Sequence, residues 1–420
     1  MKEIQYIQQP TEYLCGQACV AMIANVSVDD VILVMNNDKA TGKKDIERAL
    51  EHYGIRQAKT MTKADNSTPL PPVCLLKVFT FPVQPLDIIT GGPIMIISKT
   101  KYEASEDEIR ELFSFHKAGN VLDIAALGNG EFNAAYKVTC DNGVNCVLKI
   151  APPEDARVLS YEKNMMKSEV FWYSKMHEKT DILCPEVYVS DFSKEIIKSD
   201  CFIMEMMPGE PLWAMNFSGE EYETVQKQKI CMLTKIHRIA NDRYGYIQTG
   251  LMISWYEALK NMALSLVADC KNLGHDTPDG EKFIRFIDRH EKLLGSIPCR
   301  MVNFDLWDSN VLYNVRTGKN CWIDPERGFW GDPVADFLTL GPGPKAPLAA
   351  KKKELDTYNE MAQEKIFLTE ETEIRYALAV CYLALIEEVE KYVRYEPDNP
   401  TYIRNTVDSR EMYDMAFGLL

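Results

Sequence analysis

Residues 301–313 read MVNFDLWDSNVLY, a polar loop between two apolar, strand-like ends. Asp305 and Asn310 lie five residues apart in this loop. A carboxylate at the first position can accept the proton of an attacking hydroxyl, and an amide oxygen at the second can bind Mg²⁺. Asp and Asn are also common in ordinary turns between strands. The loop therefore indicates phosphoryl transfer only if other parts of the chain supply the remaining groups.

A second carboxylate follows the next apolar run. Residues 322–326 read WIDPE, so Asp324 comes directly after a strand that we expect to be buried. Mg²⁺ in phosphoryl-transfer sites is held by one or two carboxylates together with phosphate oxygens and water. Asp324 and Asn310 meet that requirement. The alternative is a strand-end turn at an Asp-Pro pair.

Candidate phosphate-binding residues lie upstream. Residues 127–133 read LGNGEFN, and Gly128, Gly130 and Asn133 in this turn would let backbone N–H groups approach phosphates. Lys149 follows about 20 residues later in the apolar run VLKI, at the distance of a lysine that reaches the α/β-phosphates. Glu169 on the next predicted helix is its candidate ion partner, with Glu162 as the second choice. A tight turn and a solvent-facing lysine would give the same pattern.

Taken together, these segments resemble the aminoglycoside phosphotransferase / choline kinase-like family, which has the protein-kinase fold. The family's catalytic loop has the same Asp-to-Asn spacing, and its metal motif resembles residues 323–326 (IDPE) and 331–336 (GDPVAD). Residues 201–209 resemble the hinge that binds the nucleotide base through its backbone, which implies roles for Glu205 and Met207. The motif LTKIH at 233–237 resembles a family helix in which we expect His237 to be structural.

The resemblance covers residues 105–340 and implies an α+β, bilobal kinase-like fold with a small β-sheet lobe and a larger helical lobe. It implies ATP or another nucleoside triphosphate, Mg²⁺, and a small-molecule hydroxyl as acceptor. One departure is that Asn303-Phe304 stands where the family has His-Gly. Asn can still form hydrogen bonds, so we expect activity to survive. A nucleotide-binding pseudokinase stays open as an alternative.

The N-terminal segment has a different character. Gln9 lies six residues before Cys15-Gly16, at a predicted helix start that would lower a thiol pKa. This arrangement resembles the papain-like peptidases that remove double-glycine leader peptides. No His lies in residues 53–115, where the base should be. We therefore expect a degenerate papain-like domain whose candidate partner is a peptide, with a cysteine peptidase as the alternative.

The pattern of elements divides the chain at about residue 100. We expect three parts: residues 1–100 (papain-like), 101–207 (kinase-like small lobe) and 208–420 (helical lobe with the acceptor region). Short strands are predicted at 121–127, 133–140 and 145–150, and a capped helix begins at Ser105. Further helices are predicted at 160–178, 219–241, 254–273, 280–295 and 369–392.

Composition excludes several classes of protein. The 420 residues are 46% hydrophobic and 26% charged, as in globular proteins, and the formal charge is −15. Residues 1–100 carry ten charges of each sign, so the acidic excess lies in the remainder. Such a body disfavours nucleic acid as a partner. The longest apolar run, at 376–386, is too short to cross a membrane. No apolar signal peptide and no Cys-x-x-Cys pair is present, so we expect a cytoplasmic protein with reduced cysteines.

Overall fold

The structure is a computed structural model that describes residues 20–21, 26–35, 43–53, 74–76, 87–89, 101–127 and 132–420. The chain forms two compact units, Met1–Met95 and Ile96–Leu420. Each unit is described by itself.

The described part of the first unit contains two helices and one strand pair. Helix α2 (Val28–Met35) is capped by Ser27, whose hydroxyl accepts the N–H of Asp30 at 3.1 Å. Helix α3 spans Lys43–His52, and β1 (Cys74–Leu76) pairs antiparallel with β2 (Asp87–Ile89). Gln9 and Cys15, which define the predicted papain-like site, lie outside the described residues.

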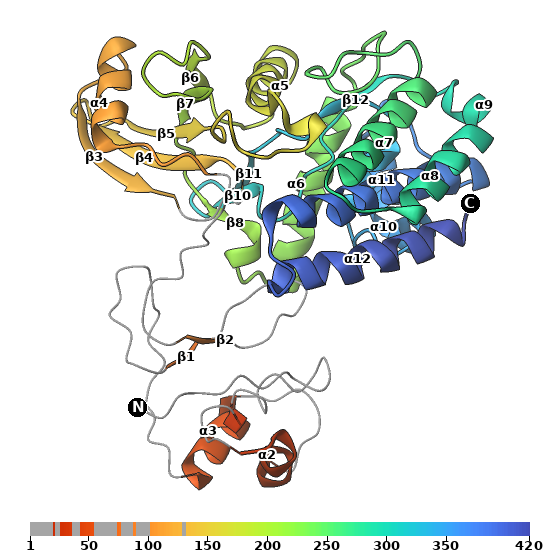
Figure 1. Cartoon of the computed structure of the whole chain (residues 1–420), viewed down its shortest axis with the longest axis horizontal. Helices are drawn as coiled ribbons and strands as arrows, with labels where there is room; N and C mark the ends of the chain where they lie inside the picture. Colours follow the sequence, from red (N-terminus) through yellow and green to blue (C-terminus); the bar gives the residue numbers. More distant parts are fainter. Residues whose placement is uncertain are drawn as a thin grey trace. The chain divides into compact units, whose positions relative to one another are not determined.

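The second unit begins with α4 (Glu106–Phe115) and a five-stranded antiparallel sheet (Figure 1). The predicted capping box is confirmed, since the Ser105 hydroxyl accepts the N–H of Glu108 and the Glu108 carboxylate accepts the N–H of Ser105. The sheet has the order β3-β4-β5-β7-β6, and the strands span Val121–Ala126, Ala134–Cys140, Asn145–Ile150, Cys201–Glu205 and Val187–Asp191, in that order. The three strands predicted between residues 121 and 150 are thus confirmed.

Strand β5 is buried on both faces, and this explains its composition. Successive side chains of a strand point to opposite faces of the sheet. Leu148 and Ile150 belong to the core under α4, whereas Val147 belongs to the larger core that α5 (Met165–Lys179) shares. Lys149 lies on the same side as Val147, so its side chain points toward α5. The helix predicted from residue 160 is interrupted, because Asn164 takes a left-handed conformation (φ 59°) between a short 3₁₀ turn and α5.

The rest of the second unit is mostly helical, as predicted (Figure 1). The predicted helix 280–295 is divided in two at His290, which has φ −102° and ψ 19°. Helices α10 and α12 were not predicted individually. The helices are α6 (Gly219–Ile236), α7 (Trp255–Asn272), α8 (Pro278–Arg289), α9 (Glu291–Leu294), α10 (Lys352–Met361), α11 (Glu370–Arg394) and α12 (Pro400–Phe417).

Helix α11 forms the centre of this lobe. Its apolar run, residues 376–386, is buried throughout and packs against α7, α8 and α12. In the described part of the chain, no helix has both the length and the apolar character needed to cross a membrane. Residues of the run belong to the hydrophobic core of this lobe.

Short strands in the helical lobe flank the motifs that the sequence predicts to be catalytic. Strand β10 (Val311–Asn314) pairs with β11 (Lys319–Trp322) and with β8 (Glu210–Pro211), while β9 (Arg300–Val302) pairs with β12 (Phe329–Gly331). Gly209 joins the sheet lobe to β8 at φ 145°. A β-carbon there would lie 2.9 Å from the Tyr313 carbonyl oxygen, so this close approach requires glycine.

Candidate active site

Lys149 and Glu169 form a buried ion pair between β5 and α5. The Lys149 Nζ donates to the two Glu169 carboxylate oxygens at 2.8 and 2.9 Å. Burial alone lowers the pKa of Lys149, but the carboxylates of Asp324 and Glu169 outweigh burial and raise that pKa. The amine therefore stays charged. Glu162, the second candidate partner, is occupied elsewhere, because it accepts a hydrogen bond from Arg394 at 2.5 Å.

Asp324 reaches the same ammonium group from the helical lobe. Its carboxylate accepts a hydrogen bond from Lys149, and its N–H donates to the Tyr173 hydroxyl at 2.9 Å. Asp324 has φ 62°, and a non-glycine residue in this left-handed region costs about 1–3 kcal/mol. The bonds to Lys149 and Tyr173 offset that cost. The sheet lobe, α5 and the helical lobe thus meet at one amine.

The donor set around Lys149 fits a divalent cation. Carboxylate oxygens of Glu169, Asp324 and Glu326 lie within 4.8 Å of one another, so three carboxylates share one ammonium group. Burial raises the pKa of Glu326 to about 7, and the neighbouring Asp324 carboxylate adds to this rise. Carboxylate oxygens are hard ligands of the kind Mg²⁺ prefers, and a divalent cation would supply the missing positive charge.

Asn310 lies beside this cluster with its amide oriented. Its Nδ2 donates to the backbone oxygen of Asp305 at 2.9 Å and to the Asp305 carboxylate at 3.0 Å. The amide oxygen accepts only a weaker bond from Ser309, at 3.3 Å. The N–H of Ile323 donates to the Asn310 backbone oxygen at 3.0 Å, which holds the loop next to Asp324. The amide oxygen of Asn310 is therefore placed to serve as a cation ligand.

The loop that carries Asp305 is held by a buried carboxylate, Asp336. The Asp336 carboxylate accepts the N–H groups of Asn303 at 3.1 Å and of Phe304 at 2.6 Å. Phe304 has φ 65°, so the loop turns sharply before the catalytic position. The Asn303 side chain then accepts the N–H of Asp305 at 2.7 Å. Asn303 thus orients the loop by a hydrogen bond from the position where the family has His.

Asp305 itself is partly buried beside charged groups. Burial raises its pKa, and the Arg327 guanidinium opposes this effect. Arg327 bonds Glu390 on α11 at 3.1 Å. The sequence did not single out Arg327, although its place next to the IDPE motif was a usable signal.

The segments that the sequence predicts to contact the nucleotide are described in part. Gly128 and Gly130 lie outside the described residues. Asn133, at the end of the same loop, is buried and donates to the Glu326 carboxylate at 2.8 Å. Glu205 ends β7, and its N–H donates to the Glu186 backbone oxygen at 2.8 Å. Met207 follows, half-buried, in the connection to β8.

Sequence comparison identifies the family. The model of the phosphotransferase enzyme family matches residues 123–362, more than half of the chain. The chain belongs to this family. This family match confirms the expectation of a phosphotransferase enzyme. No curated protein sequence matches this phosphotransferase.

Solved structures share the kinase-like fold at low sequence identity. A candidate aminoglycoside phosphotransferase of Ralstonia eutropha JMP134 is 13% identical with a TM-score of 0.54, and covers 75% of this chain and 98% of its own. A candidate fructosamine-3-kinase of Thermobifida fusca is 19% identical with a TM-score of 0.52, and the match covers 73% of this chain and 99% of that protein. A microcompartment-associated aminopropanol kinase is 16% identical with a TM-score of 0.50, and the match covers 74% of this chain and 97% of that protein. These matches show the fold of the phosphotransferase and not its acceptor.

The role of Asp336 gives a first prediction for the phosphotransferase. In Asp336→Asn, an amide nitrogen replaces one acceptor oxygen, so a buried N–H of the loop loses its partner. We expect the free energy of unfolding to fall by about 1–3 kcal/mol, measured by denaturant titration. Asp356→Asn, at a site with 60% side-chain exposure, is the matched control. Equal stability of Asp336→Asn and wild type would contradict the role assigned to Asp336.

Proposed function

We propose that the chain is a Mg²⁺-assisted, ATP-dependent phosphotransferase that phosphorylates a hydroxyl group of a small molecule. The observation that carries this proposal is the meeting of Lys149, Glu169 and Asp324 beside the Asp305–Asn310 loop. The family match supports the reaction class. The acceptor and the residue roles rest on the chemistry of the site.

Lys149 holds the phosphates of the nucleotide in this proposal. Its ion pair with Glu169 fixes the amine, and the other carboxylate bonded to the amine, that of Asp324, is exchanged for phosphate oxygens. The turn with Gly128 and Gly130 covers the phosphates through backbone N–H groups. Backbone groups of Glu205 and Met207 contact the base.

Asp324 and Asn310 are the residues that would hold Mg²⁺, with Glu326 close to them. A bound divalent cation neutralises charge on the transferred phosphoryl group. The oriented amide of Asn310 and the excess of carboxylates support this assignment.

Asp305 positions the acceptor hydroxyl and accepts its proton. The Asn310 amide binds one carboxylate oxygen of Asp305, which orients the second oxygen for the acceptor. Burial raises the pKa of Asp305, and this makes the carboxylate a better proton acceptor. Catalysis of this kind depends mainly on positioning.

The acceptor is open within the class of small hydroxyl compounds. We would screen ATP consumption with aminoglycosides, fructosamine, aminopropanol, macrolides, choline, homoserine and nucleosides. Turnover with one class would define the substrate. A protein that binds Mg-ATP and phosphorylates none of these would favour the pseudokinase alternative.

A second prediction concerns the base. Asp305→Asn keeps the size of the side chain but removes the proton acceptor, so we expect phosphoryl transfer to fall by about 10²–10⁴-fold. ADP affinity should be unchanged, because Asp305 acts on the acceptor. Steady-state kinetics with the acceptor found in the screen, together with calorimetry for ADP, measure both quantities. The exposed Asp242→Asn is the control, and turnover of Asp305→Asn equal to wild type would exclude the assigned role.

A third prediction concerns the metal and the phosphates. Mg-ATP at about 100 times its Kd should stabilise the wild type by about 2.7 kcal/mol. We expect Asp324→Ala to lose this Mg²⁺-dependent stabilisation and Lys149→Ala to reduce it. Thermal unfolding with ATP, with and without Mg²⁺, is the measurement, and each variant without ligand is its own reference. Retention of the full Mg²⁺ effect in Asp324→Ala would refute the metal assignment.

For residues 1–100 we propose a degenerate, non-proteolytic papain-like domain that binds a peptide. Its support is the sequence pattern of Gln9 and Cys15 without a His base at 53–115. His52, just before that interval, lies exposed at the end of α3.

A fourth prediction follows for Cys15. Without a base that protonates the leaving amine, turnover should stall, so we expect no cleavage of double-glycine leader peptides. Mass spectrometry of peptides incubated with the full chain is the test. Cys15→Ala should keep phosphotransferase activity within a few-fold of wild type. Cleavage that depends on Cys15 would instead place the protein among the peptidases.

A further inference from the structure

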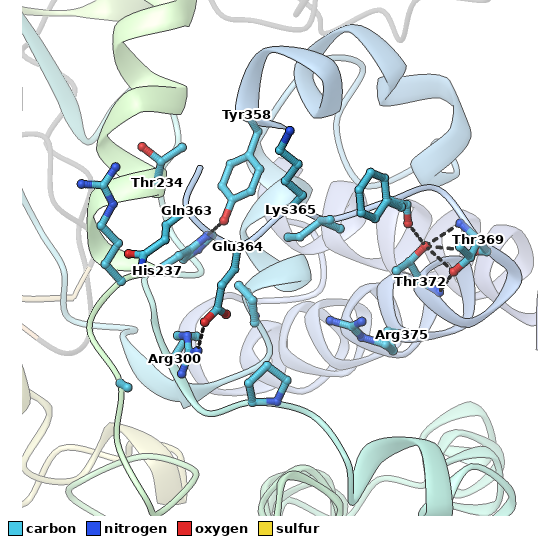
Figure 2. Close-up of a pocket in the computed structure, with 16 residues that line it drawn as sticks. Thr234, His237, Arg300, Tyr358, Gln363, Glu364, Lys365, Thr369, Thr372 and Arg375 are labelled. Carbon is cyan, nitrogen blue, oxygen red and sulfur yellow. Dashed lines mark hydrogen bonds and ion pairs between the residues drawn. The ribbon is translucent and has the colours of Figure 1, made fainter. Parts of the chain in front are cut away.

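The helical lobe contains a cavity of about 390 Å³ apart from the candidate active site (Figure 2). Its walls come from the end of α6, the segment before β9, the connection between α10 and α11, and the first turns of α11. None of the described residues assigned to phosphoryl transfer lines it. The volume suits a small molecule.

The lining of the cavity is positively charged, although the chain as a whole has a charge of −15. One lining residue, Glu364, is acidic, and it pairs with Arg300. A concave site lined by one sign of charge attracts a ligand of the opposite sign. The cationic lining residues are Arg238, Arg300, Lys365 and Arg375.

In the described part of the chain, two of these cations form no ion pair with a carboxylate. Arg375 is held by Asp332 through bonds of 2.7 and 2.5 Å, and Arg300 by Glu364. Arg238 donates a weak hydrogen bond to the Met361 backbone oxygen at 3.4 Å, and its charge helps to lower the pKa of the exposed Asp181. Within the described residues, no hydrogen bond or ion pair of Lys365 is seen. Two positive charges therefore remain for a ligand.

An apolar surface lies on the same wall. The side chain of Phe367 lines the cavity and is 64% exposed. An exposed aromatic ring beside cationic groups fits a ligand that has an apolar body and an anionic group.

We propose that this cavity binds a small organic anion, with its charged group on Arg238 and Lys365 and its apolar body against Phe367. Because the site is separate from the phosphoryl-transfer residues, binding there does not depend on the proposed function.

The cavity is connected to the catalytic loop by a chain of hydrogen bonds, which Figure 2 shows at its start. The Tyr358 hydroxyl lies 2.8 Å from His237 Nδ1, and His237 Nε2 lies 2.9 Å from the Asp336 carboxylate. A carboxylate can only accept, so the partners assign the proton to Nε2, and Tyr358 donates to Nδ1. Asp336 in turn holds the loop before Asp305. Tyr358 lines the cavity, so a ligand that contacts it can alter turnover through this relay. This coupling, unlike the binding, rests on the proposed function.

Calorimetry with phenyl phosphate, at saturating Mg-ADP and without nucleotide, tests the binding. We expect binding in both conditions, and none with phenol, which lacks the charge. The double variant Arg238→Gln/Lys365→Gln should bind about tenfold more weakly. The matched control is Arg316→Gln/Lys352→Gln, which removes the same charges at exposed positions outside the cavity. Absence of binding in wild type, equal affinity in the double variant, or displacement by ADP would overturn the proposal.

Tyr358→Phe tests the relay, because it removes the hydroxyl and keeps the ring. Phenyl phosphate should change the rate of ATP turnover by wild type at least twofold, and should bind Tyr358→Phe with unchanged affinity but without that rate effect. The same rate effect in both proteins, or no effect in wild type, would overturn the coupling.

Discussion

The pairing of the buried Lys149 ammonium group with carboxylates is the interaction on which the arrangement of the two lobes depends. A buried amine must be paired, and its partners come from α5 and from the loop after β11. Glu169 lies on α5 and Asp324 on the loop after β11, so the pairing of both carboxylates with Lys149 fixes α5 and this loop relative to β5. The same requirement leaves three carboxylates around one cation. The pairing that joins the lobes thus creates the excess negative charge that suits a divalent cation and phosphate chemistry.

Asp336 imposes a second constraint in the helical lobe. It is fully buried, and its oxygens accept two backbone N–H groups and His237. Such a carboxylate is costly to leave without donors, so the loop before Asp305 is held in its turn even with Phe304 at a positive φ. Catalysis by positioning requires a loop that does not relax. The hydrogen bonds that the buried Asp336 carboxylate requires therefore also fix the position of Asp305.

The sequence predicted the parts of this fold that are set locally. Strands between 121 and 150, the cap at Ser105 and the spacing of Asp305 to Asn310 follow from residue types over short stretches. Contacts between distant segments were harder to predict. Asn133 donates a hydrogen bond to Glu326, which lies 193 positions further along the chain, and the periodicity of apolar residues contains no information about such a pair. The breaks at Asn164 and His290 were missed because both lie within patterns that favour a continuous helix.

The distribution of charge distinguishes two regions of the second unit. Carboxylates gather around Lys149, where we propose that Mg²⁺ and the nucleotide phosphates bind, whereas guanidinium and ammonium groups gather around the cavity beside His237. Asp336 is one hydrogen bond from His237 and one from the catalytic loop. A change at the cavity wall therefore has a short, polar route to Asp305 that does not pass through the residues proposed to bind the nucleotide. Two sites of opposite charge can in this way share one rigid carboxylate without competing for the same ligand.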